Sequence, residues 1–111
     1  MFVAFEGAPM ILRLYGRGRV ILPESPEWDE WIKRFDPLPG MRQIIFADIH
    51  EVKTSCGTGV PFFSYTEERD ALHKWAEAMG EEGLDAYHHK KNRISMDGLV
   101  TPIGQKWKDR L

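Results

Sequence analysis

The sequence predicts a mixed fold that is mostly β with added helices (α+β), and three observations support this. Residues 11–22 alternate apolar or glycine residues at even positions with mainly polar residues at odd positions, which is the period of a β-strand. Residues 42–54 form a second long run typical of a strand. Later segments repeat apolar side chains at helical spacing. Because the chain has 111 residues, we expect a single domain, 1–111, with one core.

The β-strands are expected at about residues 2–22 and 42–54. Phe2–Phe5 begins the first region, and the turn Gly7–Pro9 predicts an antiparallel hairpin with the strand that follows. Pro23 ends that strand. The second strand leads into a loop of small residues, Thr54–Pro61. Two long strands and a short one form too small a sheet to be stable alone, so we expect further strands from the same fold or from a partner.

Helices are expected at about residues 26–35, 67–79 and 81–92. Ser25 and Pro26 suit the N-cap and the first turn of the first helix. Thr66 is the expected cap of the second helix, and Gly80 is expected to end it in a left-handed conformation. From residue 97 onward we expect an extended tail. Trp107 fits no helical stripe and is therefore the tryptophan that we consider for a dimer contact.

One face of the first long strand is basic. Arg13, Tyr15, Arg17 and Arg19 occupy successive odd positions, so their side chains share that face. Guanidinium groups match the geometry of planar carboxylate and phosphate anions. The strand therefore predicts either an anion-binding face or a solvated outer face without a ligand, and this segment alone leaves both readings open.

Composition argues against several classes of function. The formal net charge is −2, which disfavours a nucleic-acid partner, and no apolar run is long enough to span a membrane. The single cysteine, Cys56, rules out an internal disulfide and fits a cytoplasmic location. Cys56 has two readings, a nucleophile or a small loop residue, and no histidine–acid pair stands beside it in the sequence. The four histidines lack metal-ligand spacing, so we expect no metal site.

Several segments carry a resemblance to a known family. They are PMILRLYGRGRV, PEWDEW, RQIIFADIHEVKTSCGTGVPFF, ERDALHKWAEAMGEEGLDAYHHKKN and SMDGLVTPIG. In order and spacing they resemble the pyridoxamine 5′-phosphate oxidase-like family, in particular its uncharacterised bacterial and fungal members with the FMN-binding split-barrel fold. The match covers about residues 1–104, and family members are longer at the N-terminus. The resemblance therefore implies the C-terminal part of a split β-barrel with flanking helices.

The resemblance also implies a cofactor and a partner. Family members of this type are homodimers that hold FMN at the subunit interface. FMN needs cations or N–H donors for its phosphate, and small polar residues near its ribityl chain and ring. The residues of this chain that suit these needs are Arg13, Arg17, Thr54, Ser55, Cys56 and Gly57. Related split barrels bind haem or a deazaflavin coenzyme, and these residues exclude neither.

Two hypotheses of function follow from the resemblance. The first is an FMN-dependent oxidoreductase that acts on an unidentified small-molecule substrate. The alternative is a non-catalytic, truncated split-barrel module that holds a cofactor or promotes dimerisation. No residue of the chain stands out as a general acid or base, and flavin chemistry often needs none from the protein.

Overall fold

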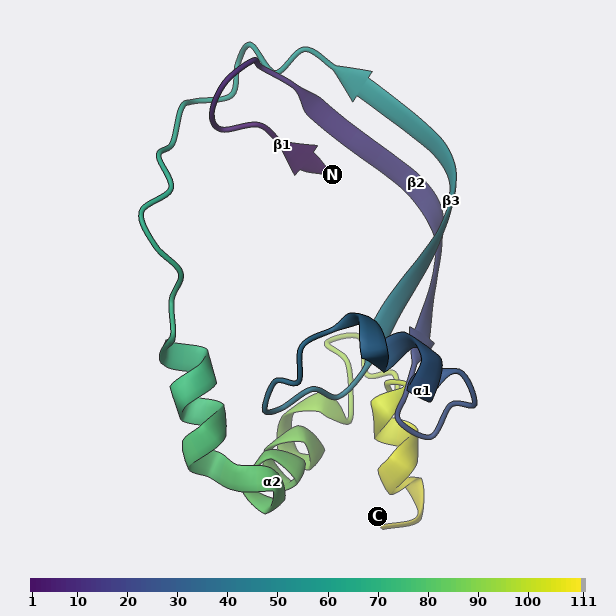
Figure 1. Ribbon diagram of the computed structural model, residues 1–111. Coiled ribbons are helices and arrows are strands. Elements are labelled where there is room, and N and C mark those ends of the chain that lie inside the picture. Colours follow the sequence, from purple (N-terminus) through teal and green to yellow (C-terminus); the bar gives the residue numbers. More distant parts are fainter. Residues whose placement is uncertain (111) are drawn as a thin grey trace. The chain divides into compact units, whose positions relative to one another are not determined.

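The computed structural model describes residues 1–110, with side chains described for residues 1–107, and it confirms a mixed α+β fold (Figure 1). Its elements, with η denoting a 3₁₀ helix, are β1 (Phe2–Val3), β2 (Ile11–Ile21), α1 (Trp28–Trp31), η1 (Ile32–Arg34), β3 (Ile44–Ser55), α2 (Ala71–Asn92) and η2 (Ile103–Arg110). No helix in this described part of the chain is both long enough and apolar enough to cross a membrane.

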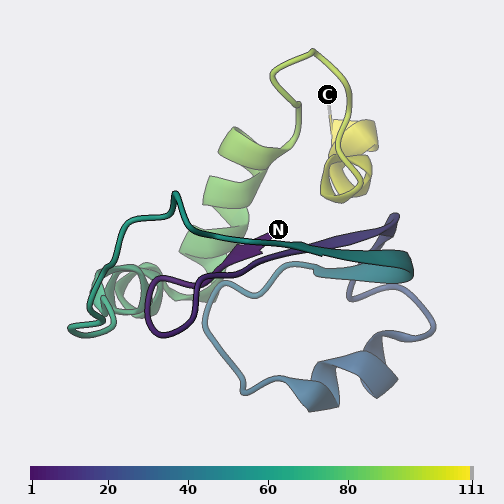
Figure 2. The same cartoon turned by 90° about the horizontal axis from the view of Figure 1, so that it is seen from above.

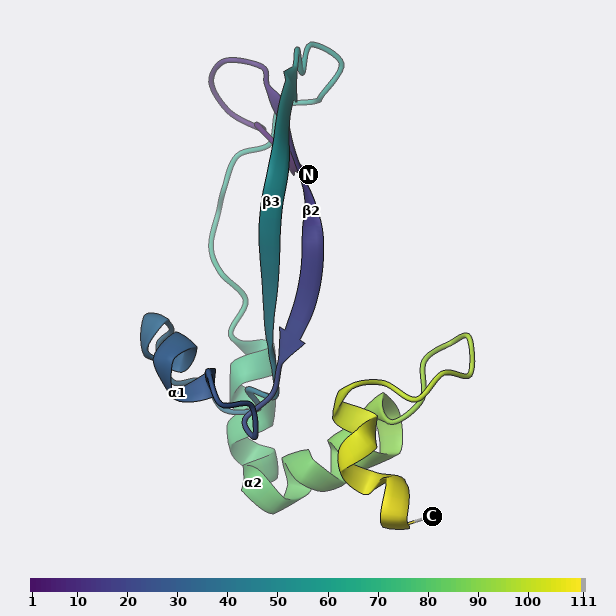
Figure 3. The same ribbon diagram turned by 90° about the vertical axis from the view of Figure 1, so that its right-hand side faces the viewer.

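The three strands form one open sheet in the order β1-β2-β3. β1 is antiparallel to β2, with Phe2 opposite Leu12 and Val3 opposite Ile11. β2 and β3 run in opposite directions as a long ribbon (Figures 1 and 3). Within residues 1–110 no strand pairs with the outer edge of β3, so these strands do not close a barrel. The sheet agrees with the predicted class, and the partial barrel stays a prediction.

The chain separates into two compact units. Met1–Arg19 and Phe46–Glu68 form the first, which we call the hairpin unit. Val20–Ile45 and the residues from Arg69 onward form the second, which we call the helical unit. The buried apolar side chains of the described residues all belong to the helical unit: Ile21, Ile44, Ala76, Leu84, Ile103 and Trp107.

The strand bounds differ from the prediction in two places. The region 2–22 is interrupted, because residues 4–10 form a connection in which Gly7 adopts a φ of 70°. The N–H of Ala4 donates to the carbonyl of Met10 and closes this connection. The second strand covers 44–55 rather than 42–54.

The first predicted helix, 26–35, is much shorter in the structure. α1 covers only Trp28–Trp31, and η1 continues it to Arg34. Ser25 does not cap it, since its hydroxyl accepts the N–H of Leu22 at 2.9 Å and Glu27 occupies the N-cap position. A helix of one turn gains few hydrogen bonds for the residues it orders, and Pro37 favours an extended conformation just before it.

The two later helices are joined end to end in α2, which bends at Gly80 (Figure 3). Gly80 has φ 65° and ψ 175°, so the predicted break between 79 and 81 at a glycine with positive φ is confirmed, although its ψ is extended rather than that of a left-handed cap. The predicted start at 67 and the cap at Thr66 are wrong, because α2 begins at Ala71. The backbone before α2 forms hydrogen bonds with a distant segment. The N–H of Phe63 donates to the carbonyl of Phe5, and the N–H of Tyr65 donates to the side-chain carboxylate of Glu6.

The expected extended tail is also wrong. After the bridge between Ile94 and Val100, the chain turns back and forms η2, which contacts α2 (Figure 2). Thr101 fixes this return, because its hydroxyl donates to the carbonyl of Asn92 and accepts the N–H of Gly104 at 3.0 Å. Trp107 is only 2% exposed and forms part of the core of the helical unit, so it is not an exposed residue available for a dimer contact.

Candidate functional site

In the hairpin unit, the structure brings two of the predicted site residues together. Arg13 on β2 donates from Nη1 to the hydroxyl of Ser55, the last residue of β3, at 2.8 Å. Both side chains are partly buried. A guanidinium group has five N–H donors, so this bond orients Arg13 and leaves other donors available for an anion.

The rest of the basic face is less uniform than the sequence suggests. Lys53 Nζ lies 5.5 Å from the centre of the Tyr15 ring and also pairs with Glu51 at 2.6 Å. Arg19 lies over the ring of Phe46 at 4.5 Å. Arg17 is exposed, and we find no hydrogen bond or ion pair for it within the described residues. Arg13 and Arg17 are thus the two guanidinium groups best placed for an anion.

Lys53 is a residue that the sequence analysis missed. It lies on a neighbouring strand, and only the pairing of β2 with β3 puts it beside Tyr15. The sequence of one strand contains no signal for a contact between a lysine and an aromatic ring on the neighbouring strand. The ring face that Lys53 covers is not free to serve as a flat wall for a ligand.

The small-residue loop supports only part of its predicted role. Thr54 precedes Ser55 on β3, and strand alternation directs their side chains to opposite faces. Cys56 is exposed, and its Sγ lies 3.7 Å from Thr58 Oγ1. This hydrogen bond lowers the pKa of the Cys56 thiol below its ordinary value. The loop therefore does not gather all four predicted residues around one point.

Gly57 has a structural reason to be glycine. It is buried, and a Cβ at this position would lie 2.8 Å from the backbone nitrogen of Met10. Its small size serves the close packing of two backbone segments. Its place in the FMN site stays a prediction.

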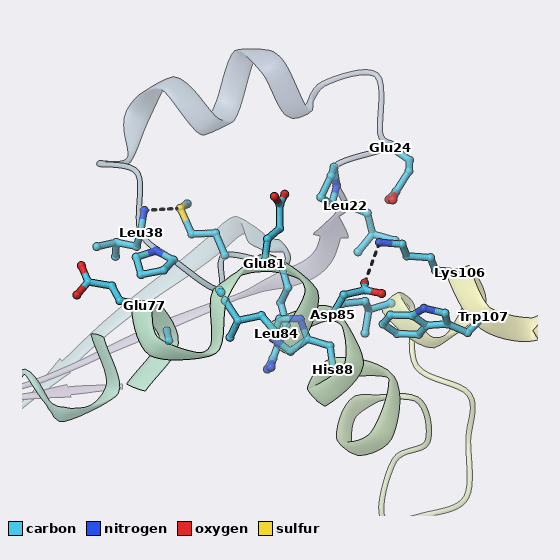
Figure 4. A pocket seen from close by; sticks show the side chains of 18 residues that line it. Leu22, Glu24, Leu38, Glu77, Glu81, Leu84, Asp85, His88, Lys106 and Trp107 are labelled. Carbon is cyan, nitrogen blue, oxygen red and sulfur yellow. Dashed lines mark hydrogen bonds and ion pairs between the residues drawn. The ribbon is translucent and has the colours of Figure 1, made fainter. Parts of the chain in front are cut away.

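The helical unit contains a pocket of about 490 Å³ that the sequence analysis did not foresee (Figure 4). The two halves of α2, the loop after β2, the loop before β3, and η2 line it. Leu84 and Trp107 contribute apolar walls, whereas Glu24, Glu77 and Glu81 contribute carboxylates. The bend at Gly80 places residues from both halves of α2 around the same cavity.

His88 lines this pocket and has a perturbed titration. Partial burial lowers its pKa below the usual value, and the positive charges of Arg42 and Lys106 add to this effect. The nearby carboxylate of Asp85 opposes it. The neutral imidazole is therefore the favoured form at neutral pH. Arg42 itself donates to the side-chain oxygen of Asn92 at 2.8 Å.

The residues of the hairpin unit fit FMN in part. An anchored Arg13 and an exposed Arg17 suit a phosphate dianion, and the hydroxyl of Ser55 suits a polar chain. The face of Tyr15 that Lys53 covers does not contribute to the fit. Among the described residues no group of three or more His, Cys, Asp or Glu side chains could hold a metal ion.

The fold and the basic face of β2 define a mixed α+β protein with an open antiparallel sheet and a strand that carries exposed arginines. Its sequence is 35% identical, over 114 aligned positions, to the Pyridoxamine 5′-phosphate oxidase family protein ustO of Aspergillus flavus. The aligned region covers 89% of this chain and 46% of that relative, so the chain spans about half the relative's length. The chain is thus a distant homologue of a pyridoxamine 5′-phosphate oxidase family protein, which confirms the resemblance seen in its motifs.

Two other comparisons gave no match. No protein-family model matches the chain, and no solved structure matches it.

Proposed function

We propose that this chain is the FMN-binding part of a pyridoxamine 5′-phosphate oxidase-like flavoprotein with oxidoreductase activity. The observation that carries the proposal is the hydrogen bond between Arg13 and Ser55, which orients a guanidinium group on the basic face of β2. The relationship to a pyridoxamine 5′-phosphate oxidase family protein supports it. We also propose that the whole protein carries out an oxidation or reduction of a small-molecule substrate.

In this proposal each residue has a defined task. Arg13 and Arg17, which share one face of β2 at positions about 13 Å apart along the strand, bind the phosphate. Ser55 holds Arg13 in place and offers its hydroxyl to the ribityl chain. Bound FMN supplies hydride or electron transfer. The protein itself therefore needs to bind and orient the cofactor rather than provide an acid or a base.

The proposal includes a homodimer. Leu14, Ile49 and Val52 of the hairpin unit leave much of their apolar surface exposed, with 58% exposure for Val52. An unpaired strand edge beside exposed apolar side chains favours association with another chain. We propose that a second copy covers this surface and that the protein acts in the cytoplasm. Sedimentation velocity would detect the dimer, and a monomer at all concentrations would contradict it.

A visible absorption spectrum followed by titration with FMN and with riboflavin tests the cofactor. Riboflavin lacks the phosphate, so replacing both Arg13 and Arg17 by Ala should weaken FMN binding more than tenfold and leave riboflavin binding unchanged. The expected loss follows from charge-assisted hydrogen bonds of about 1.5–3 kcal/mol each. Arg69→Ala is the matched control, because Arg69 is an exposed arginine of the helical unit.

A second function, a non-catalytic module that holds a cofactor or promotes dimerisation, is favoured by the open sheet within residues 1–110. A colourless protein that forms dimers and binds no added FMN would support this module and reject the flavoprotein. An absorption band of bound haem would reject FMN as the cofactor.

A further inference from the structure

The pocket of the helical unit is large enough and sufficiently apolar for a small molecule. Its volume of about 490 Å³ falls within the range of about 300–1,000 Å³ that is typical of ligand sites. Leu84, Ile103 and Trp107, all buried, form part of its lining. These side chains belong to the core and are held in place by packing, so the pocket has fixed apolar walls rather than mobile surface chains.

Charge is distributed unevenly around these walls. Four carboxylates line the pocket, from Glu24, Glu77, Glu81 and Asp85, against the permanent cations of Arg42 and Lys106. Lys106 lies 3.5 Å from Asp85, so these two charges largely offset each other. Arg42 is directed to Asn92, which does not line the pocket.

Within the described part of the chain, the other three carboxylates of the lining have no permanent positive charge as a partner. Glu77 lies 3.0 Å from the imidazole of His73, a partner that is charged only when protonated. For Glu24 and Glu81 we find no hydrogen bond or ion pair with any of residues 1–107. His88, the remaining titratable group of the lining, has a lowered pKa and does not supply a compensating positive charge at neutral pH.

We propose that this pocket binds an organic cation with an apolar body, such as an alkylammonium group. The apolar body lies against Leu84 and Trp107, and the ammonium group lies at the carboxylate of Glu81, the first residue after the bend at Gly80. An ammonium group next to a carboxylate forms a charge-assisted hydrogen bond.

This pocket is distinct from the proposed FMN site in both place and charge. Every lining residue belongs to the helical unit, whereas Arg13, Arg17 and Ser55 belong to the hairpin unit. A phosphate dianion would be repelled by the carboxylates that attract an ammonium group. The failure of the FMN proposal would therefore leave the proposal for this pocket unaffected, and the reverse also holds.

The test uses the full chain and three probes of equal chain length: n-hexylammonium, 1-hexanol and hexanoate. Two-dimensional amide NMR would follow each titration. We expect n-hexylammonium to shift the signals of Leu84 and of the Trp107 indole. Its binding should be at least tenfold tighter than that of hexanoate, with hexanol between them. Added FMN should leave the n-hexylammonium titration unchanged.

Variants locate the ammonium group. Glu81→Gln should weaken n-hexylammonium binding about two- to fivefold, as expected for an ionic contact at an exposed carboxylate, and leave hexanol binding unchanged. Glu82→Gln is the matched control, because Glu82 is the adjacent residue on α2 and does not line this pocket. Equal binding of n-hexylammonium and hexanoate, equal losses in both variants, or no shift at Leu84 and Trp107 would each overturn the proposal. The last result would also be found if a second copy of the chain filled the pocket.

Discussion

The hairpin unit and the helical unit differ in how they bury apolar surface. The helical unit contains all the buried apolar side chains found among the described residues, with Ile21 and Trp107 almost completely enclosed. The hairpin unit instead exposes much of its apolar surface, including Leu14 and Val52 on its long strands. Burial of apolar surface is the main source of folding free energy. The helical unit therefore has a core of its own, whereas the hairpin unit leaves most of its apolar side chains exposed.

Removing Trp107 should have the largest effect on stability. Trp107→Ala creates a cavity in the core of the helical unit and should lower the free energy of unfolding by about 3–5 kcal/mol. Phe62→Ala in the hairpin unit should change it by less than about 0.5 kcal/mol, because Phe62 is 82% exposed. Urea unfolding followed by circular dichroism measures both values. Similar losses in the two variants would contradict the difference in burial between the two units.

A pair of glycines tests the hairpin unit itself. Gly57→Ala should cost about 1–3 kcal/mol, because its Cβ would force the backbone at Met10 to move. Gly59→Ala should be neutral within about 0.5 kcal/mol, since no atom lies within 4 Å of the added Cβ. Thermal unfolding of the two variants makes this measurement. A stable Gly57→Ala variant would mean that the loop does not pack on Met10 in solution.

The smallest expected effect concerns pH and His88. Because the pKa of His88 is lowered in the folded protein, the unfolded chain binds a proton more readily below about pH 6.5. The contribution of His88 to stability is therefore fully present above that pH and is lost as the pH falls through its folded pKa. Urea unfolding at pH 7.5 and 5.5 should show a smaller loss at the lower pH for His88→Gln than for the unmodified chain. Equal losses would place His88 in an environment like that of the unfolded chain.

The sequence predicted the parts of the fold that depend on local pattern. Strict alternation identified β2, and Gly80 marked the break in α2, since only a residue without a side chain adopts a positive φ at little cost. It failed at the start of α2, because bonds from Phe63 and Tyr65 to the distant Phe5 and Glu6 hold the segment just before the predicted start, and the helix begins only at Ala71. No local pattern contains that information.

The candidate sites divide in the same way. The sequence placed Arg13 and Arg17 on one face of a strand because side chains alternate along any extended chain. Only the pairing of β2 with β3 decided that Arg13 meets Ser55 and that Lys53 covers Tyr15.

The burial of Trp107 could not be predicted from the sequence alone. It fits no periodic stripe, yet the return of the chain at Thr101 buries it beside α2 and helps to form the pocket. The sequence thus set the class of fold, the basic strand and the family resemblance, which follow from local spacing and motif order. The tertiary structure alone decided the core and the acidic pocket, because both arise from contacts between residues far apart in the chain.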